Sequence, residues 1–142
     1  MFERHRGLAY WLLGSAAAMI VGSFGPWASV LGMSVSGTDG SNDGWLVVAV
    51  AGIGALGFYL RREKRSAAIG PLVGGLAGLV ITLYDRSNLQ NAIDNGGEFA
   101  QALAHVGWGL NVALAGSLSM TVAAVVWWKR ARGSILAAST PE

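Results

Sequence analysis

The chain lacks cysteine altogether, and only 13% of its 142 residues are charged, about half the share found in ordinary soluble domains. Without cysteine there can be no disulfide, no thiolate metal ligand, no thiol nucleophile and no lipid attached through sulfur. So few charges argue against an ordinary soluble domain. They also lie at the ends of long apolar stretches rather than in one patch, so we expect no nucleic-acid partner.

Four apolar stretches are free of Asp, Glu, Lys and Arg, at about 7–24, 45–60, 67–84 and 106–128. A helix that spans the hydrocarbon core of a bilayer needs about 20 such residues. The stretches therefore predict an all-α membrane protein, a four-transmembrane-helix bundle that embeds in a lipid bilayer.

The second stretch is the shortest, and at 1.5 Å per residue it covers only about 24 Å of a core about 30 Å thick. Trp45 at one end and Tyr59 at the other are the residue types that anchor a span at the membrane interface.

We expect a single domain over 1–132, followed by a disordered cytoplasmic tail over 133–142.

The basic residues set the expected orientation, because Lys and Arg gather on the cytoplasmic side of membrane proteins. Nine of the ten fall on one side of the four spans, and Arg86 is the exception. Both termini are thus expected in the cytoplasm, with the protein in the cytoplasmic membrane. The first stretch is longer than the core of a cleaved signal peptide, so we expect it to be retained.

The two segments on the opposite side differ in pattern. Apolar residues alternate with Gly and Ser in the first, which predicts a short external β-hairpin that turns near Leu31 and Gly32. In the second, 87–105, apolar residues recur every four positions. This spacing predicts two short amphipathic helices, broken at 95–97, that lie on the membrane surface or cap the bundle.

Small residues recur every four positions in three of the four spans, a spacing that lets helix backbones approach closely in lipid. We interpret these stripes mainly as internal packing faces, with a homo-oligomer or partner interface as the alternative. Their members are Gly14, Ala18 and Gly22, then Gly70, Gly74 and Gly78, then Gly109, Ala113, Ser117 and Thr121.

Candidate chemistry is sparse. No ionisable residue lies within the apolar stretches, where transport and proton relay need one. Thr82 and Asn111 are each expected to form a hydrogen bond with a neighbouring helix. The loop 39–44 resembles the first half of a calcium site, but Val50 stands where the bidentate carboxylate is needed, which favours an ordinary turn. Since His5 and His105 lie outside the apolar cores, we expect no enzyme, cofactor or metal site.

The loop pattern carries a resemblance. Gly25-Pro26-Trp27-Ala28, Ser34-Val35-Ser36-Gly37, Asp39-Gly40, Asp43-Gly44-Trp45, Leu83-Tyr84-Asp85 and Gly107-Trp108-Gly109 resemble small four-span membrane proteins of actinobacteria and their phages. That family has no assigned activity, so the resemblance implies a topology and no catalytic residues. Four spans with a strand-bearing first external loop are also similar to the architecture of claudins. The similarity is one of architecture alone, since the cysteine pair of claudins is missing from this chain.

These features predict a non-catalytic accessory, assembly or interaction subunit of the cell envelope, acting in a homo-oligomer or a larger membrane complex. The alternatives are a small oligomeric channel or transporter, and a phage-type effector of lysis, exclusion or defence. An external interaction surface is expected at Trp27, Asp39, Asp43, Trp45, Asp85 and Trp108.

Overall fold

The computed structural model describes residues 6–39, 43–61 and 64–138. Four of its helices are long and apolar enough to cross a membrane. A small three-stranded sheet accompanies them. The elements in chain order are α1 (Arg6–Phe24), β1 (Pro26–Val30), β2 (Met33–Ser36), α2 (Asp43–Arg61), the short 3₁₀ turn η2 (Arg65–Ala68), α3 (Ile69–Asn95), α4 (Gly97–Leu103), β3 (Ala104–Val106) and α5 (Trp108–Ala138).

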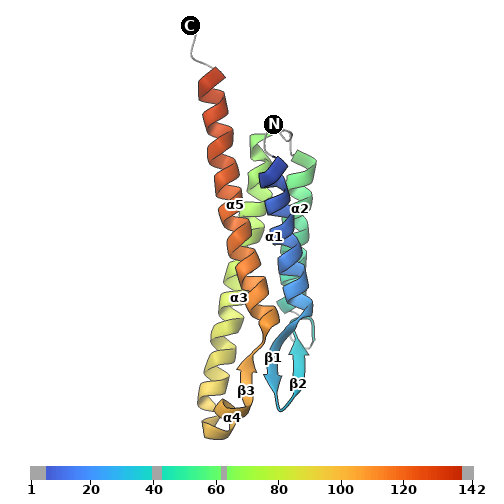
Figure 1. Cartoon of the computed structure of the whole chain (residues 1–142), viewed down its shortest axis with the longest axis vertical. Helices are drawn as coiled ribbons and strands as arrows, with labels where there is room; N and C mark the ends of the chain where they lie inside the picture. The colour runs from blue at the N-terminus through green and yellow to red at the C-terminus, as the bar shows by residue number, and fades with distance from the viewer. Residues whose placement is uncertain (1–5, 40–42, 62–63, 139–142) are drawn as a thin grey trace.

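The molecule is elongated, with the four long helices side by side and the sheet at one end (Figure 1). α1 packs against α2 and α5, and α3 packs against the same two helices, so the four form a ring. The first residue of α1 and the last residue of α5 lie toward the end opposite the sheet (Figure 1). We call the two ends of the bundle the sheet end and the terminal end.

Three of the long helices extend well beyond their apolar stretches. α2 has 19 residues and therefore extends about 28 Å. This length is closer to the thickness of a bilayer core than the roughly 24 Å of its apolar stretch. α3 has 27 residues and continues to Asn95, where the sequence predicted a separate amphipathic helix. α5 has 31 residues and reaches Ala138, so the expected disordered tail is helical over 133–138, and its remainder lies outside the described residues.

The predicted β-hairpin is confirmed. β1 and β2 pair antiparallel with Val30 opposite Met33, and the two turn residues, Leu31 and Gly32, have φ angles of 52° and 80°. Positive φ at both central positions matches the right-handed twist of the strands, which is why two-residue hairpins favour it.

The segment 87–105 was predicted incorrectly in two respects. Its first half continues α3 rather than forming its own helix, although the break falls at Gly96 as expected. Its last residues form β3, which pairs with β1 on the side away from β2. The short strand was hidden in the sequence because three residues of Ala, His and Val carry no periodicity that distinguishes a strand from a helix end.

The core of the bundle combines a few large side chains with many alanines. Phe58 of α2 and Trp127 of α5 meet edge to face, with ring centroids 5.0 Å apart. Leu12, Met19 and Met120 are also fully buried. Around them the contacts between helices involve Ala and Gly, so the helix backbones come close together.

Candidate functional site

The small residues at the sheet end of the α1–α5 contact lie where the two helix backbones approach closely. A Cβ atom added to Gly22 would lie 2.7 Å from the carbonyl oxygen of Gly109 and would also meet the backbone of Ala113. A Cβ added to Gly109 would lie 2.7 Å from the carbonyl oxygen of Gly25. Any side chain larger than hydrogen would push the two backbones apart.

The glycines of α3 serve two different neighbours. Gly70 and Gly74 face α2, where an added Cβ at Gly74 would lie 2.6 Å from the carbonyl oxygen of Val50. Gly78 faces α1 and α5 instead, where Met19 and Ser117 cover it. The stripe that looked like one face in the sequence is therefore shared between two contacts inside the bundle.

Gly14 and Ala18 differ from the other members of the stripes. An added Cβ at Gly14 would meet nothing within 4 Å. Together with Ser15, Gly116 and Ser119, among others, they line a shallow groove of about 310 Å³ between α1 and α5.

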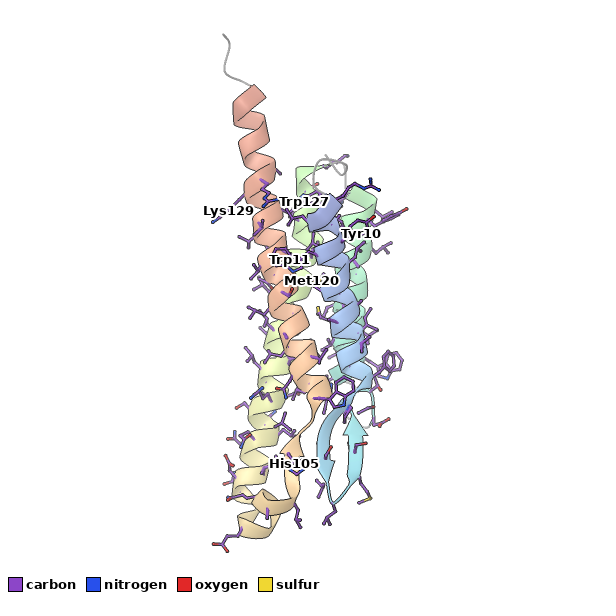
Figure 2. The ribbon with its side chains drawn as sticks, in the orientation of Figure 1. Tyr10, Trp11, His105, Met120, Trp127 and Lys129 are labelled. Carbon is purple, nitrogen blue, oxygen red and sulfur yellow. The ribbon has the colours of Figure 1, made fainter. Side chains whose placement is uncertain are left out.

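The hydroxyls of this groove are already satisfied. Ser15 and Ser119 hydrogen-bond each other at 2.8 Å, and the indole nitrogen of Trp11 donates to Ser119 at 2.8 Å. Figure 2 shows Trp11 in the region where α1 meets α5. This link between helices could not be read from the sequence, because serine spacing alone does not show which helix lies opposite.

Polar groups inside the bundle bond mainly to their own helices. Thr82 donates to the carbonyl of Gly78 at 2.7 Å, so the expected bond between helices is wrong for this residue. Ser117 and Ser23 likewise donate to carbonyls four residues earlier. For Asn111 the expectation is confirmed, since its side-chain oxygen accepts a hydrogen bond from Arg86 of α3.

At the sheet end the apolar face of the sheet stands opposite α3. The strand register places Ala28 and Val35 on one face, with Val30 and Met33 on that same face. Leu89 and Ile93, one helical turn apart on α3, approach this face across a gap. The two apolar walls do not close, and they leave an open groove.

This groove, which we call the head groove, consists of two adjoining cavities of about 330 and 290 Å³. Ala28, Leu89 and Ala92 line both of them. On the β2 side α3 does not cover the sheet, so Met33 is 72% exposed and Val35 is 51% exposed. Exposed apolar surface of this kind, next to a concave site, is typical of a surface that binds something.

The end of the head groove nearest the bundle is acidic. Asp39, Asp43 and Asp85 line it, and the carboxyls of Asp43 and Asp85 are close enough to share a hydrogen bond. Oδ2 of Asp85 is covered, yet it has no hydrogen-bond partner among the described residues. Arg86 does not neutralise this pair, because it donates to Asn111 instead.

The three tryptophans of the expected interaction surface have different surroundings. Trp27 is only 7% exposed; its indole nitrogen donates to the carbonyl of Gly22 at 3.0 Å, and its role is mainly structural. Trp45 is half exposed and meets Phe24 edge to face. Trp108 is also half exposed and covers Gly25.

Of the six residues expected on the interaction surface, Trp27, Asp39, Asp43 and Asp85 come together in the head groove, while Trp45 and Trp108 do not line it. Sequence reasoning missed the apolar walls, especially Leu89, Ala92 and Ile93 on α3. The spacing of Leu89 and Ile93 does predict an amphipathic helix, but it leaves open whether the apolar face of that helix meets the membrane surface or caps the bundle.

Within the described ranges, no group of three His, Asp or Glu side chains could hold a metal ion. Residues 40–42 of the calcium-like loop lie outside those ranges. His105 is exposed on β3 at the sheet end (Figure 2), and it borders the apolar part of the head groove.

Comparison of the chain with protein-family models, curated proteins and solved structures finds no match. The resemblance to small four-span membrane proteins therefore stays a prediction from the loop pattern. What the site can do has to be inferred from its own geometry.

Proposed function

We propose that this protein is a non-catalytic accessory or assembly subunit of a bacterial membrane complex, which uses its sheet end to dock a partner. The observation that carries the proposal is the contrast between a closely packed bundle and an open groove beside it. The groove has two apolar walls, an acidic end and exposed apolar rims. These are features of a recognition surface.

The interior of the bundle supports docking rather than conduction through one copy. In the part of the chain that the structure describes, the buried polar side chains are Ser15, Ser23, Thr82 and Ser117. All four are hydroxyls that donate to their own helices. A pathway for ions or polar solutes is expected to be lined by charged or unsatisfied polar groups.

We propose that the four apolar helices cross the cytoplasmic membrane with both termini in the cytoplasm. Arg6, Arg61 and Lys64 belong to the terminal end, as do Lys129 and Arg130, whereas Asp39, Asp85 and Asp94 belong to the sheet end. Figure 2 shows Lys129 pointing away from the bundle toward its surroundings near that end. This asymmetry agrees with the positive-inside rule.

Because the chain has no native cysteine, single cysteines can test this orientation directly. Ser34→Cys on β2 should react with a membrane-impermeant maleimide in intact cells. Lys64→Cys, at the terminal end, should react only after the cells are opened. The opposite pattern would invert the proposed orientation, and labelling of both in intact cells would exclude a membrane between them.

The docking role is tested by mild solubilisation of native membranes, followed by affinity capture of the tagged protein and mass spectrometry. A defined partner should co-purify in stoichiometric amount in several detergents. Recovery of a lone monomer under all of these conditions would rule out the accessory-subunit function.

A further inference from the structure

The head groove combines two chemistries in a fixed order. Next to the bundle lie Asp43 and Asp85, and farther along α3 come the apolar side chains of Leu89 and Ile93. From residue 85 to residue 93 is eight helical steps, or about 12 Å. This length accommodates about four residues of extended chain.

We propose that the head groove binds a short apolar segment of a second protein, with one Lys or Arg side chain of that segment seated between Asp43 and Asp85. The proposal rests on the docking function above and specifies its surface and the chemistry of its partner. The apolar part of the segment covers Leu89, Ile93 and the exposed side chains of β2.

Charge complementarity identifies the cation. Two neighbouring carboxyls repel each other when both are ionised, and the repulsion grows as they are removed from water. Asp85 also holds an oxygen that is covered but unpaired within the described residues. An ammonium or guanidinium group placed there donates hydrogen bonds to both carboxylates, and charge-assisted bonds of this kind are the strong ones.

A second copy of this chain is a poor source of that cation. Nine of its ten Lys and Arg residues lie at or before the start of α1, from the end of α2 to η2, or toward the end of α5. The described ones among them, such as Arg61 and Lys129, belong to the terminal end. The tenth, Arg86, already bonds Asn111. Two copies in one membrane with the same orientation would therefore not bring a basic residue to the head groove, so a different protein has to supply it.

The polarity of the groove also argues against a bilayer lipid. A lipid keeps its tails in the membrane and its headgroup at the surface. The head groove has the reverse order, because its charged end adjoins the bundle and its apolar end lies farther away. A protein segment that approaches from outside the membrane can match this order.

The probes are two fluorescent peptides, acetylated and amidated, that carry lysine or glutamate followed by the same four leucine and valine residues. Binding to the full-length protein in lipid nanodiscs is measured by fluorescence anisotropy, with empty nanodiscs as the blank. The lysine peptide should bind at least about tenfold more tightly than the glutamate peptide. Equal affinity for the two peptides would overturn the proposal.

Charge reversal gives the sharpest test. Asp85→Lys should reverse the preference, so that the glutamate peptide binds more tightly, and Asp85→Asn should reduce the preference for lysine without reversing it. The matched control is Asp94→Lys on the same helix, since Asp94 is exposed and bonds Gln90 outside the groove. If the preference for the lysine peptide is unchanged in Asp85→Lys, or if it changes as much in Asp94→Lys, the proposed binding position of the cation is wrong.

Other occupants give different results. If hexylammonium displaces the lysine peptide with equal affinity, the groove selects a small amphiphile and the proposal is wrong. If the protein self-associates in nanodiscs and Asp85→Lys abolishes that association, the occupant is a second copy, which also overturns it. If the protein captures a partner from native membranes but does not bind the lysine peptide, the docking function stands and only this inference is wrong.

Discussion

The bundle and the sheet end of this molecule are built on opposite principles. In the bundle, glycine and alanine bring helix backbones together until no side chain fits between them, as at Gly22 and Gly74. At the sheet end, the apolar walls formed by the sheet and α3 stay apart and leave a groove. This difference supports the proposal that the bundle is a scaffold and that recognition takes place in the groove beside it.

The largest expected effect is the loss of helix packing at Gly74. In Gly74→Leu the new side chain has to enter the space held by the carbonyl of Val50, so the free energy of unfolding should fall by about 3 kcal/mol or more. SDS titration in mixed micelles, followed by tryptophan fluorescence, measures it. Gly52→Leu on the facing helix is the control, because a Cβ at Gly52 meets nothing within 4 Å; equal loss in both variants would contradict the packing account.

A matched pair within one helix sharpens the comparison between packed and open positions. Gly22→Ala should lower the free energy of unfolding by about 1–3 kcal/mol, because its Cβ meets the backbone of α5. Gly14→Ala should leave it unchanged or raise it by up to about 1 kcal/mol, because alanine favours helix where space is open. The same titration measures both variants. If Gly14→Ala were the more damaging one, the open groove between α1 and α5 would be filled in the native protein.

The junction between the bundle and the sheet should depend on one buried hydrogen bond. Trp27→Phe removes the bond from the indole nitrogen to the carbonyl of Gly22 and keeps most of the ring, so about 0.5–1.5 kcal/mol of stability should be lost. Hydrogen exchange should accelerate at β1 and β2 while the centre of α5 stays protected. Uniform acceleration throughout the chain would show that sheet and bundle unfold as a single unit.

The smallest expected effect is a gain at the hairpin turn. Leu31 has a positive φ angle, which asparagine tolerates better than leucine, and Asn-Gly is the preferred pair for this turn. Leu31→Asn should therefore raise the free energy of unfolding by about 0.5 kcal/mol, measured by thermal melting. Gly32→Ala should lower it, because Gly32 has a φ angle of 80°, and a gain there would contradict the turn geometry.

Much of the bundle could be predicted from the sequence, since uncharged stretches of about 20 residues leave few alternatives to apolar helices. The hairpin could be predicted as well, because its alternation of apolar and small residues has a period of two. The helix ends could not. α3 continues past Asp85 and Arg86 to Asn95, and this far part of the helix lies beside β3, a neighbour that no local pattern shows.

The candidate site was predicted only in part. Asp39, Asp43 and Asp85 were chosen for their position beyond the apolar stretches, and the structure brings them to one end of the head groove. The apolar walls were missed because one of them depends on β3. This strand comes from a distant part of the sequence and pairs with β1 at the edge of the sheet. Trp27 was chosen as a surface residue, but its indole is buried against α1.

We propose that recognition occurs in the head groove and that the bundle is its scaffold. The most direct test compares partner capture from native membranes for the wild-type protein, for Ala92→Trp, which fills the head groove, and for Gly14→Leu, which fills the groove between α1 and α5. Ala92→Trp is expected to lose the partner, whereas Gly14→Leu is expected to keep it. Retention by Ala92→Trp together with loss in Gly14→Leu would contradict the account and place recognition on the bundle.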